Sequence, residues 1–313
     1  MGLIRLKHIT LLAVSALIAG CAPPAENHSD ESKPVDPVTE EQTLQTPLEG
    51  AVRHHLHATD IGEDFVIDVY VPPGTTEPLP VVYLTDGNMM FPMVLSTLRL
   101  LQFGNEVEPV ILVGIGYKDA AQSMALRNRD LTPTLDEQFI AQAQESGPPV
   151  LPQAPPGGAD AFLDFIRDQV KPLIAQNYPA KPDNDTLMGD SLGGLFTLHA
   201  LFTRPQEYTR YVAGSPSIWW DDTVLFATEQ AYADAHSDLA AELFISIGSL
   251  EQPEGTEAYG MVTNMHKMAD TLEQRGYPSL QLTRYEFAGE THLSVIPATF
   301  SRGLRAVLGT TAQ

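Results

Sequence analysis

The sequence predicts an α/β protein in which helices cover both faces of a mostly parallel sheet. Short, almost wholly apolar runs at Val81–Thr85 and Val110–Gly116 are typical of strands that are buried on both faces. The segment Asp160–Gln176 carries its apolar residues at helical spacing and therefore predicts an amphipathic helix. Runs of these two kinds alternate along the chain, and this alternation favours parallel strands joined by helical crossovers.

The expected elements follow one another from residue 51. Ala51–Asp60 and Phe65–Val71 predict a hairpin, because the side chains of the second segment alternate with period two after a glycine-containing turn. Asp119–Gly158 contains six prolines and is long for a connection, so it is either a lid or substrate-shaping insertion or a loose excursion. The other expected elements are the helix Met90–Phe103, the strand Thr186–Met188, the helix Gly193–Phe202, the strand Tyr211–Ala213, the helix Thr223–His236, the strand Leu243–Ile247, the helix Thr256–Arg275, the strand Leu280–Phe287 and the helix Val295–Leu308.

The first twenty residues are expected to be an export signal and not part of the fold. Arg5 and Lys7 precede an apolar run, Ile9–Ala19, that is too short to cross a bilayer as a mature helix. The segment Ile18-Ala19-Gly20-Cys21 resembles the bacterial lipobox. The resemblance implies that residues 1–20 are a lipoprotein signal peptide and that Cys21 is lipidated. A buried or reactive thiol is the alternative interpretation of this cysteine, the only one in the chain.

Residues 21–50 are expected to form a disordered tether, and residues 51–313 the folded domain. After Cys21 the tether carries seven acidic residues against one lysine, and it has no apolar period. By the sorting rule for such lipoproteins, Ala22 favours the outer membrane. The predicted location is therefore the cell envelope, at the outer membrane or in the periplasm if the cell is Gram-negative. The formal net charge of −22 disfavours nucleic acid as a partner.

The segment Gly189-Asp190-Ser191-Leu192-Gly193 fits the pattern G-x-S-x-G. A predicted strand precedes it and a predicted helix follows it, which is the setting of the nucleophile elbow of the α/β-hydrolase fold. There a tight turn presents the serine hydroxyl at a helix N-terminus. We therefore predict Ser191 as a nucleophile and the Leu192 N–H as an oxyanion donor. A glycine-rich turn with an idle serine is the alternative.

A serine hydroxyl attacks an ester only when a base takes its proton, and in this fold the chain order is serine, acid, histidine. His292 follows the last predicted strand and is the candidate base. Glu251 follows the strand before it and is the candidate acid that orients the imidazole. Glu254 and Glu257 lie close behind and are alternative acids, and a dyad without an acid is a further alternative.

A second oxyanion donor is expected from the turn after another central strand. Asp86-Gly87-Asn88 ends such a strand, so we assign the backbone N–H of Asn88, although the same residues also suit a simple turn. The histidines at positions 54, 55 and 57 do not predict a metal site, because strand alternation divides them between the two faces.

Several segments together resemble the putative esterase family of the α/β-hydrolase superfamily, which includes enterochelin and other siderophore esterases. The likeness runs through most of residues 51–310. It rests on Ile67-Asp68-Val69-Tyr70-Val71-Pro72, Tyr83-Leu84-Thr85-Asp86-Gly87, Val113-Gly114-Ile115-Gly116-Tyr117, Arg127-Asn128-Arg129-Asp130-Leu131-Thr132-Pro133, Gly157-Gly158-Ala159-Asp160-Ala161-Phe162, the elbow, Ser215-Pro216-Ser217-Ile218-Trp219-Trp220 and Gly289-Glu290-Thr291-His292.

The resemblance implies an α/β-hydrolase with a Ser–His catalytic pair, ester substrates and no metal or other cofactor. It also implies that the Gly248–Glu251 segment supplies the acid. Relatives that hydrolyse iron-siderophore trilactones tend to offer cationic residues to an anionic ligand, whereas this chain has only six lysines.

Three residues are candidates for contact with the substrate, namely Asp86, Arg127 and Trp219. Arg127 either grips an anionic substrate or forms a structural ion pair with Asp130, and we favour the ion pair. Trp219 and Trp220 either form an aromatic wall beside the site, or one of them packs in the core and the other packs under a loop.

The sequence thus predicts a serine ester hydrolase that works through a covalent acyl-enzyme. Its partners are expected to be a small-molecule ester, with a siderophore ester among the candidates, and the membrane through the lipid anchor. The alternatives are a surface acyltransferase on the same fold and a non-catalytic, ligand-binding lipoprotein. The identity of the ester and the oligomeric state are left open.

Overall fold

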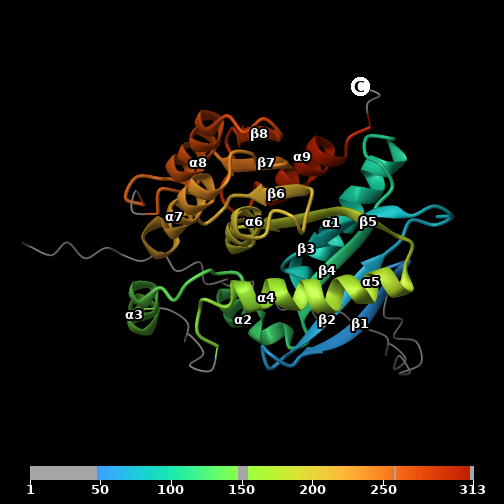
Figure 1. Ribbon diagram of the computed structural model, residues 1–313. Coiled ribbons are helices and arrows are strands. Elements are labelled where there is room, and N and C mark those ends of the chain that lie inside the picture. The colour runs from blue at the N-terminus through green and yellow to red at the C-terminus, as the bar shows by residue number, and fades with distance from the viewer. Residues whose placement is uncertain (1–47, 147–153, 257–258, 311–313) are drawn as a thin grey trace, which may run out of the picture.

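The computed structural model describes residues 48–146, 154–256 and 259–310 (Figure 1). The predicted signal peptide, the cysteine that is predicted to be lipidated and nearly all of the predicted tether lie outside these ranges. The described chain builds one eight-stranded sheet with helices on both faces. None of the helices in the described ranges is long and apolar enough to span a bilayer.

The strands lie in the order β1-β2-β4-β3-β5-β6-β7-β8. β2 is antiparallel to both β1 and β4, whereas every neighbouring pair from β4 to β8 is parallel. The sheet is therefore mostly parallel, as the sequence predicts. The strands are β1 Ala51–Ala58, β2 Glu63–Tyr70, β3 Leu79–Leu84, β4 Ile111–Tyr117, β5 Ala180–Asp190, β6 Arg210–Gly214, β7 Ala241–Gly248 and β8 Leu280–Phe287.

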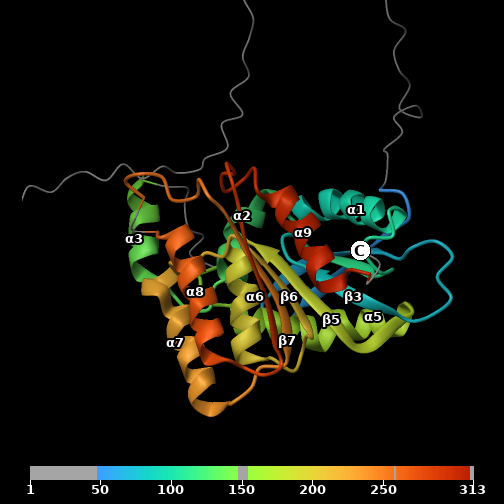
Figure 2. The same ribbon diagram turned by 90° about the horizontal axis from the view of Figure 1, so that it is seen from above.

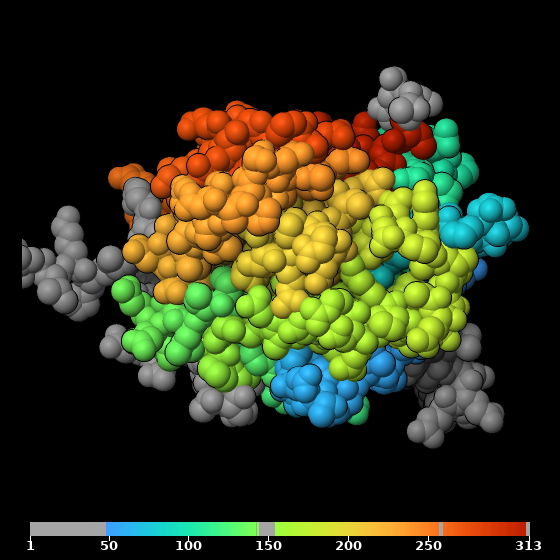
Figure 3. Space-filling model, in the orientation of Figure 1, coloured from blue at the N-terminus to red at the C-terminus, as the bar shows by residue number. Residues whose placement is uncertain are grey.

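Two apolar layers lie on opposite faces of this sheet, because successive side chains of a strand point to opposite faces. Val82 and Leu84 of β3 belong to the layer beneath α1 and α9, and Val81 and Tyr83 belong to the layer beneath α4 to α8. Figure 2 shows α1 and α9 side by side on one face, and Figure 3 shows the opposite face, covered by residues of α4 to α8. The helices are α1 Gly87–Phe103, α2 Ser123–Asp130, α3 Glu137–Ser146, α4 Ala159–Phe165, α5 Lys171–Asn177, α6 Leu192–Thr203, α7 Trp220–Ala235, α8 Met261–Arg275 and α9 Ile296–Leu308.

Most element boundaries differ from the sequence prediction by up to three residues, and four elements differ in a more informative way. The helix expected over 160–176 is α4 and α5 joined by a π-helical turn, Ile166–Val170. β5 begins at Ala180 and not at Thr186. Its first half is polar and solvent-facing, so this part of the strand has no apolar pattern that predicts it from the sequence. α7 begins with three left-handed residues, 221–223. α8 begins after Gly260, since Thr256 still belongs to a turn in which its N–H donates to the Pro253 carbonyl.

The long segment 119–158 contains two helices, α2 and α3, that the sequence did not predict. Leu126 and Leu131 are buried in the core layer beneath α4. The Thr134 carbonyl accepts a hydrogen bond from the Trp220 indole, at 3.2 Å. The described part of this segment is therefore packed on the domain, which disfavours the interpretation as a loose excursion.

Candidate active site

Ser191 lies alone in the turn between β5 and α6. Its backbone has φ 62° and ψ −118°, a strained conformation for a residue with a side chain. The Ser191 N–H donates to the Gly214 carbonyl at 3.0 Å, and its carbonyl accepts from the Ser217 N–H at 3.1 Å, so the neighbouring β6 loop holds the turn. A Cβ on Gly189 would lie 2.6 Å from Thr85 Oγ1, which shows why the motif requires glycine there.

His292 lies in the loop between β8 and α9. Its Nε2 is 3.0 Å from Ser191 Oγ, and its Nδ1 is 2.6 Å from Glu251 Oε2. A carboxylate oxygen can only accept, so the Nδ1–H donates to Glu251 and Nε2 is left to accept the serine proton. The three predicted residues therefore form one continuous hydrogen-bonded chain.

Glu251 lies in the loop that follows β7, and its side chain is fully buried. Its second oxygen, Oε1, accepts from the Ser215 hydroxyl and from the Gly248 N–H, each at 2.6 Å. Both carboxylate oxygens are thus held in place. Of the alternative acids, Glu254 is exposed and Glu257 lies outside the described residues.

The surroundings of His292 set its proton affinity. Burial lowers the pKa of the imidazole, but the hydrogen bond to Glu251 and the negative charge of that carboxylate outweigh this effect and raise the pKa above its ordinary value of 6.5. The base therefore takes up a proton readily, and its protonated form is stabilised during attack.

The two predicted oxyanion donors each lie in the first turn of a helix. Leu192 begins α6, and Asn88 is the second residue of α1. Within the described chain, neither backbone N–H has a hydrogen-bond acceptor, as is usual for the first turn of a helix. Such free N–H groups can stabilise an oxyanion.

The ion pair expected between Arg127 and Asp130 is wrong. Arg127 forms a two-pronged pair with Asp86, with Nε to Oδ1 at 2.8 Å and Nη2 to Oδ2 at 2.9 Å. Asp130 pairs with Arg129 instead, with Nε to Oδ1 at 2.6 Å and Nη2 to Oδ2 at 2.8 Å. The reason is the direction of α2, which points Arg127 toward the turn after β3, where Asp86 lies. Arg129, two residues later, then lies beside the buried Asp130.

Trp219 is partly buried in an aromatic cluster. Its ring centroid lies 5.1 Å from that of Tyr259 and 6.3 Å from that of Phe139 in α3. Trp220 is fully buried. The two tryptophans therefore join α7 to the 119–158 segment, and one of them is core, as the packing alternative holds.

The structure also brings two residues to the site that the sequence reasoning did not select. Ser215 follows β6 and donates to Glu251. Asp190 precedes the nucleophile, and burial raises its pKa to about 8. Their position directly at the ends of β5 and β6 was the available signal, because such ends share one edge of a parallel sheet.

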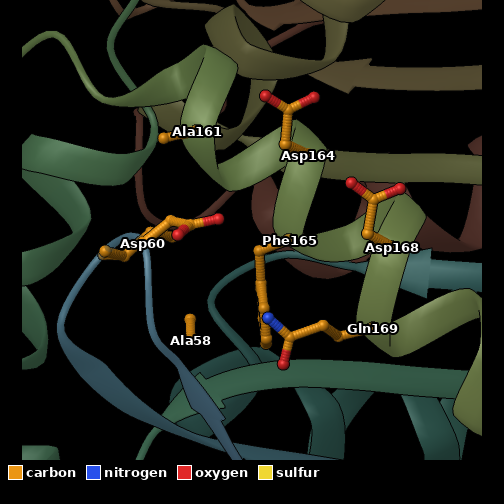
Figure 4. A pocket seen from close by; sticks show the side chains of 8 residues that line it. Ala58, Asp60, Ala161, Asp164, Phe165, Asp168 and Gln169 are labelled. Atoms are coloured by element: carbon orange, nitrogen blue, oxygen red, sulfur yellow. The ribbon is translucent and has the colours of Figure 1, made fainter.

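Two of the three histidines of β1, His54 and His57, form hydrogen bonds with other side chains. His54 Nε2 lies 2.5 Å from the Tyr178 hydroxyl, and His57 Nδ1 lies 2.8 Å from Asp64. A hollow of about 80 Å³ between the β1–β2 turn and α4 shares no residue with the Ser191 site (Figure 4). It is lined by Ala58, Asp60, Ile61, Ala161, Asp164, Phe165, Asp168 and Gln169.

The fold and the Ser–His–Glu chain define a serine ester hydrolase of the α/β-hydrolase class. The sequence model of the family described as "Putative esterase" matches residues 58–288. The protein belongs to this family.

Relatives with names make the likeness more specific. The ferri-bacillibactin esterase BesA of Bacillus subtilis is 32% identical over 241 residues, which cover 73% of this chain and 78% of that protein. The siderophore triacetylfusarinine C esterase of Aspergillus fumigatus is 32% identical over 286 residues, which cover 82% of this chain and 93% of that protein. These relatives support a carboxylic ester hydrolase and lend no support to the acyltransferase or the ligand-binding alternative.

Solved structures agree with the fold. The siderophore hydrolase EstB of Aspergillus nidulans superposes with a TM-score of 0.72 at 28% identity, over 86% of this chain and 99% of that one. The BES protein of Bacillus cereus gives 0.72 at 29% identity, over 85% and 97%. The predicted α/β-hydrolase fold is confirmed.

Proposed function

We propose that this protein hydrolyses siderophore esters through an acyl-enzyme on Ser191. The observation that carries the proposal is the unbroken chain from the buried Glu251 carboxylate through His292 to the Ser191 hydroxyl. The named relatives, which are esterases of siderophores, supply the substrate class.

The first half of the reaction forms the acyl-enzyme. His292 Nε2 takes the hydroxyl proton of Ser191 as Oγ attacks the ester carbonyl, and the carbonyl π electrons move to the oxygen. The Leu192 and Asn88 N–H groups donate to that oxyanion. The intermediate collapses, the C–O bond to the alcohol breaks, and His292 returns the proton to the leaving alkoxide.

The second half restores the enzyme. His292 takes a proton from water as the water oxygen attacks the acyl carbonyl, and the acid leaves when Ser191 Oγ regains its proton. Glu251 keeps the imidazole in the same tautomer throughout, since its carboxylate accepts from Nδ1–H in both halves.

Three exposed apolar side chains are sequence neighbours of proposed site residues, and we take them as an apolar rim of the site. These are Met89, Leu250 and Leu293. The charge of Arg127 is already matched by Asp86. This rim favours an ester within an apolar or uncharged scaffold over a multiply anionic one, and the formal net charge of −22 acts in the same direction.

The decisive variant is Ser191→Ala. We expect it to lose roughly 10⁵–10⁶-fold in kcat on p-nitrophenyl butyrate and to lose labelling by a fluorophosphonate probe. A Ser96→Ala variant, which changes an exposed serine of α1 whose hydroxyl donates only to the Pro92 carbonyl of the same helix, is the matched control and should keep its turnover. Labelling that persists in Ser191→Ala contradicts the nucleophile assignment. A panel of iron-loaded hydroxamate and catecholate triesters then tests the substrate class, and no turnover of any of them contradicts the siderophore proposal.

We also propose that Cys21 carries a lipid anchor that holds the domain at the cell envelope, with residues 1–20 removed as a signal peptide. Support comes from the charged start, the short apolar run and the small residues before the cysteine. Expression of the full chain in a Gram-negative host with radiolabelled palmitate tests the proposal. Label should enter the wild-type chain and not Cys21→Ser, and label in both variants would contradict it.

A further inference from the structure

The turn Asp86–Asn88 carries the proposed second oxyanion donor, and its backbone is strained. Asp86 has φ 54° and ψ 36°, a left-handed conformation that residues other than glycine seldom adopt. Such a conformation persists only where surrounding contacts impose it. The contacts that hold Asp86 therefore decide where the Asn88 N–H points.

The main contact is the ion pair with Arg127. The Arg127 side chain is 10% exposed and the Asp86 side chain 6% exposed, so both charges are almost entirely removed from water. Removing one partner of such a pair leaves an unmatched buried charge, which is strongly unfavourable. Arg127 belongs to α2, in the 119–158 segment, and it thereby ties this segment to the end of β3.

The other residues of the turn are held by β4. The Asn88 side chain donates from Nδ2 to the Tyr117 carbonyl at 2.8 Å and accepts from the Tyr117 N–H at 2.6 Å. A Cβ on Gly87 would lie 2.8 Å from the β4 backbone at Gly114, so the turn is pressed against that strand. With Arg127 on one side and β4 on the other, the turn has little freedom to move.

The turn also touches the nucleophile elbow. A Cβ on Gly193 would lie 2.5 Å from Thr85 Oγ1 and 3.3 Å from Asp86 Oδ2. Asp86 is therefore packed on the first turn of α6, where the Leu192 N–H lies. A shift of Asp86 would move one oxyanion donor relative to the other.

We propose that Arg127 is a positioning residue, which holds Asp86 in its left-handed conformation and so fixes the Asn88 N–H against the Leu192 N–H. The proposal rests on the proposed ester hydrolysis at Ser191. In this proposal α2 of the 119–158 segment contributes to stabilising the transition state. The Arg127 guanidinium pairs with Asp86 and does not bind the substrate.

The experiment compares Arg127→Met, Arg127→Lys, Asp86→Asn and the double variant Asp86→Asn/Arg127→Met on p-nitrophenyl butyrate, a neutral ester, and on mono-p-nitrophenyl succinate, an anionic ester. Misplacing one donor should lower kcat roughly 10- to 10²-fold and leave KM within about twofold. The double variant should lose no more than either single variant, because both changes break one interaction. Lysine cannot reproduce the two-pronged pair and should fall between wild type and Arg127→Met.

Arg275→Met is the matched control. Arg275 makes a similar two-pronged pair with the buried Glu229, at 2.9 Å for both contacts, and neither residue belongs to the Ser191 site. The Arg275→Met variant should have a lower melting temperature than the wild type and an unchanged kcat. Thermal unfolding of every variant by circular dichroism measures the loss of stability, and the near-isosteric Asp86→Asn serves if Arg127→Met does not fold.

Two results would overturn the proposal. One is an unchanged kcat in Asp86→Asn or in Arg127→Met. The other is a rise in KM confined to anionic esters in Arg127→Met, which assigns the charge to substrate binding. Failure of the proposed function itself is distinct, because wild type would then resist fluorophosphonate labelling, whereas failure of this inference leaves Ser191 labelled.

Discussion

The two halves of the site are held in different ways. Ser191, Glu251 and His292 each lie in the loop directly after a parallel strand, and backbone hydrogen bonds between neighbouring loops fix them. Examples are the Ser191 N–H to the Gly214 carbonyl at 3.0 Å and the Leu250 N–H to the Glu290 carbonyl at 2.9 Å. The oxyanion turn also follows a strand, but a side-chain ion pair from a separate helix holds it.

This difference teaches that the two halves need not vary together. Strand register and the loop hydrogen bonds position the first half, so changes elsewhere that keep the sheet, the elbow and these three residues should keep the Ser–His–Glu chain. The second half is held by β4 and, in addition, by one arginine in the 119–158 segment, so changes in that segment can alter transition-state stabilisation without moving the nucleophile. The following predictions test this separation.

The largest effect is expected in the first half. Glu251→Gln should lower kcat/KM roughly 10³–10⁴-fold, because an amide can donate to Nδ1 and stabilise the tautomer whose Nε2 is unable to accept the serine proton. Glu254→Gln is the control, since Glu254 is exposed and should have no effect on turnover. Steady-state kinetics on a neutral ester measures both, and the reverse pattern would refute the assignment of the acid.

The contact between the halves can be altered at Gly193. Gly193→Ala places a Cβ 2.5 Å from Thr85 Oγ1, which should push the oxyanion turn away and lower kcat/KM roughly 10²-fold. Thr85 Oγ1 is buried and has no hydrogen-bond partner in the described structure, so Thr85→Ala costs little and makes room. The double variant should regain part of the activity. Full activity in Gly193→Ala would show that the halves are not in close contact.

The acid limb of the pH profile reports the His292 environment. The base must be neutral to accept a proton, and its pKa is raised, so kcat/KM should fall as the pH drops through a midpoint above 6.5. In Glu251→Gln the main stabilising partner of the imidazolium is lost, so the residual activity should show a midpoint at lower pH. Rates on a substrate without titratable groups measure both midpoints, and an unmoved limb would assign it to another residue.

The smallest effect is expected from Asp190→Asn, and it concerns stability. Burial raises the Asp190 pKa from 3.8 to about 8, so the folded state keeps a proton that the unfolded state has lost. Its contribution is most favourable below pH 3.8 and is lost as the pH rises to about 8. Asparagine should remove this dependence and raise the unfolding free energy near pH 8 by roughly 1–3 kcal/mol. Urea unfolding of both proteins at several pH values measures the difference in unfolding free energy. A stability gain of Asp190→Asn over the wild type that does not grow with pH contradicts the prediction.

Much of the site could be predicted because its signals are local. The glycines around Ser191 mark a turn that only small residues permit, and the order of serine, acid and histidine follows from strands that end at one edge. The partner of Arg127 could not be predicted in this way. Asp130 is three residues away on the same helix and Asp86 is far away in the chain, so the choice depends on how α2 lies against β3. The same limit applies to the start of β5, whose polar half pairs with β3 at Leu79 without an apolar pattern.

The sequence by itself determined the fold class and was enough to select Ser191, His292 and Glu251 as the proposed nucleophile, base and acid, since period, turn residues and strand order are properties of the chain. Only the tertiary structure decided which charges are matched and which N–H groups remain free. Those outcomes depend on the packing of α2 and of the β3 turn against the elbow. This packing brings Arg127 within about 3 Å of Asp86 and Arg129 within about 3 Å of Asp130, and so decides which ion pairs form.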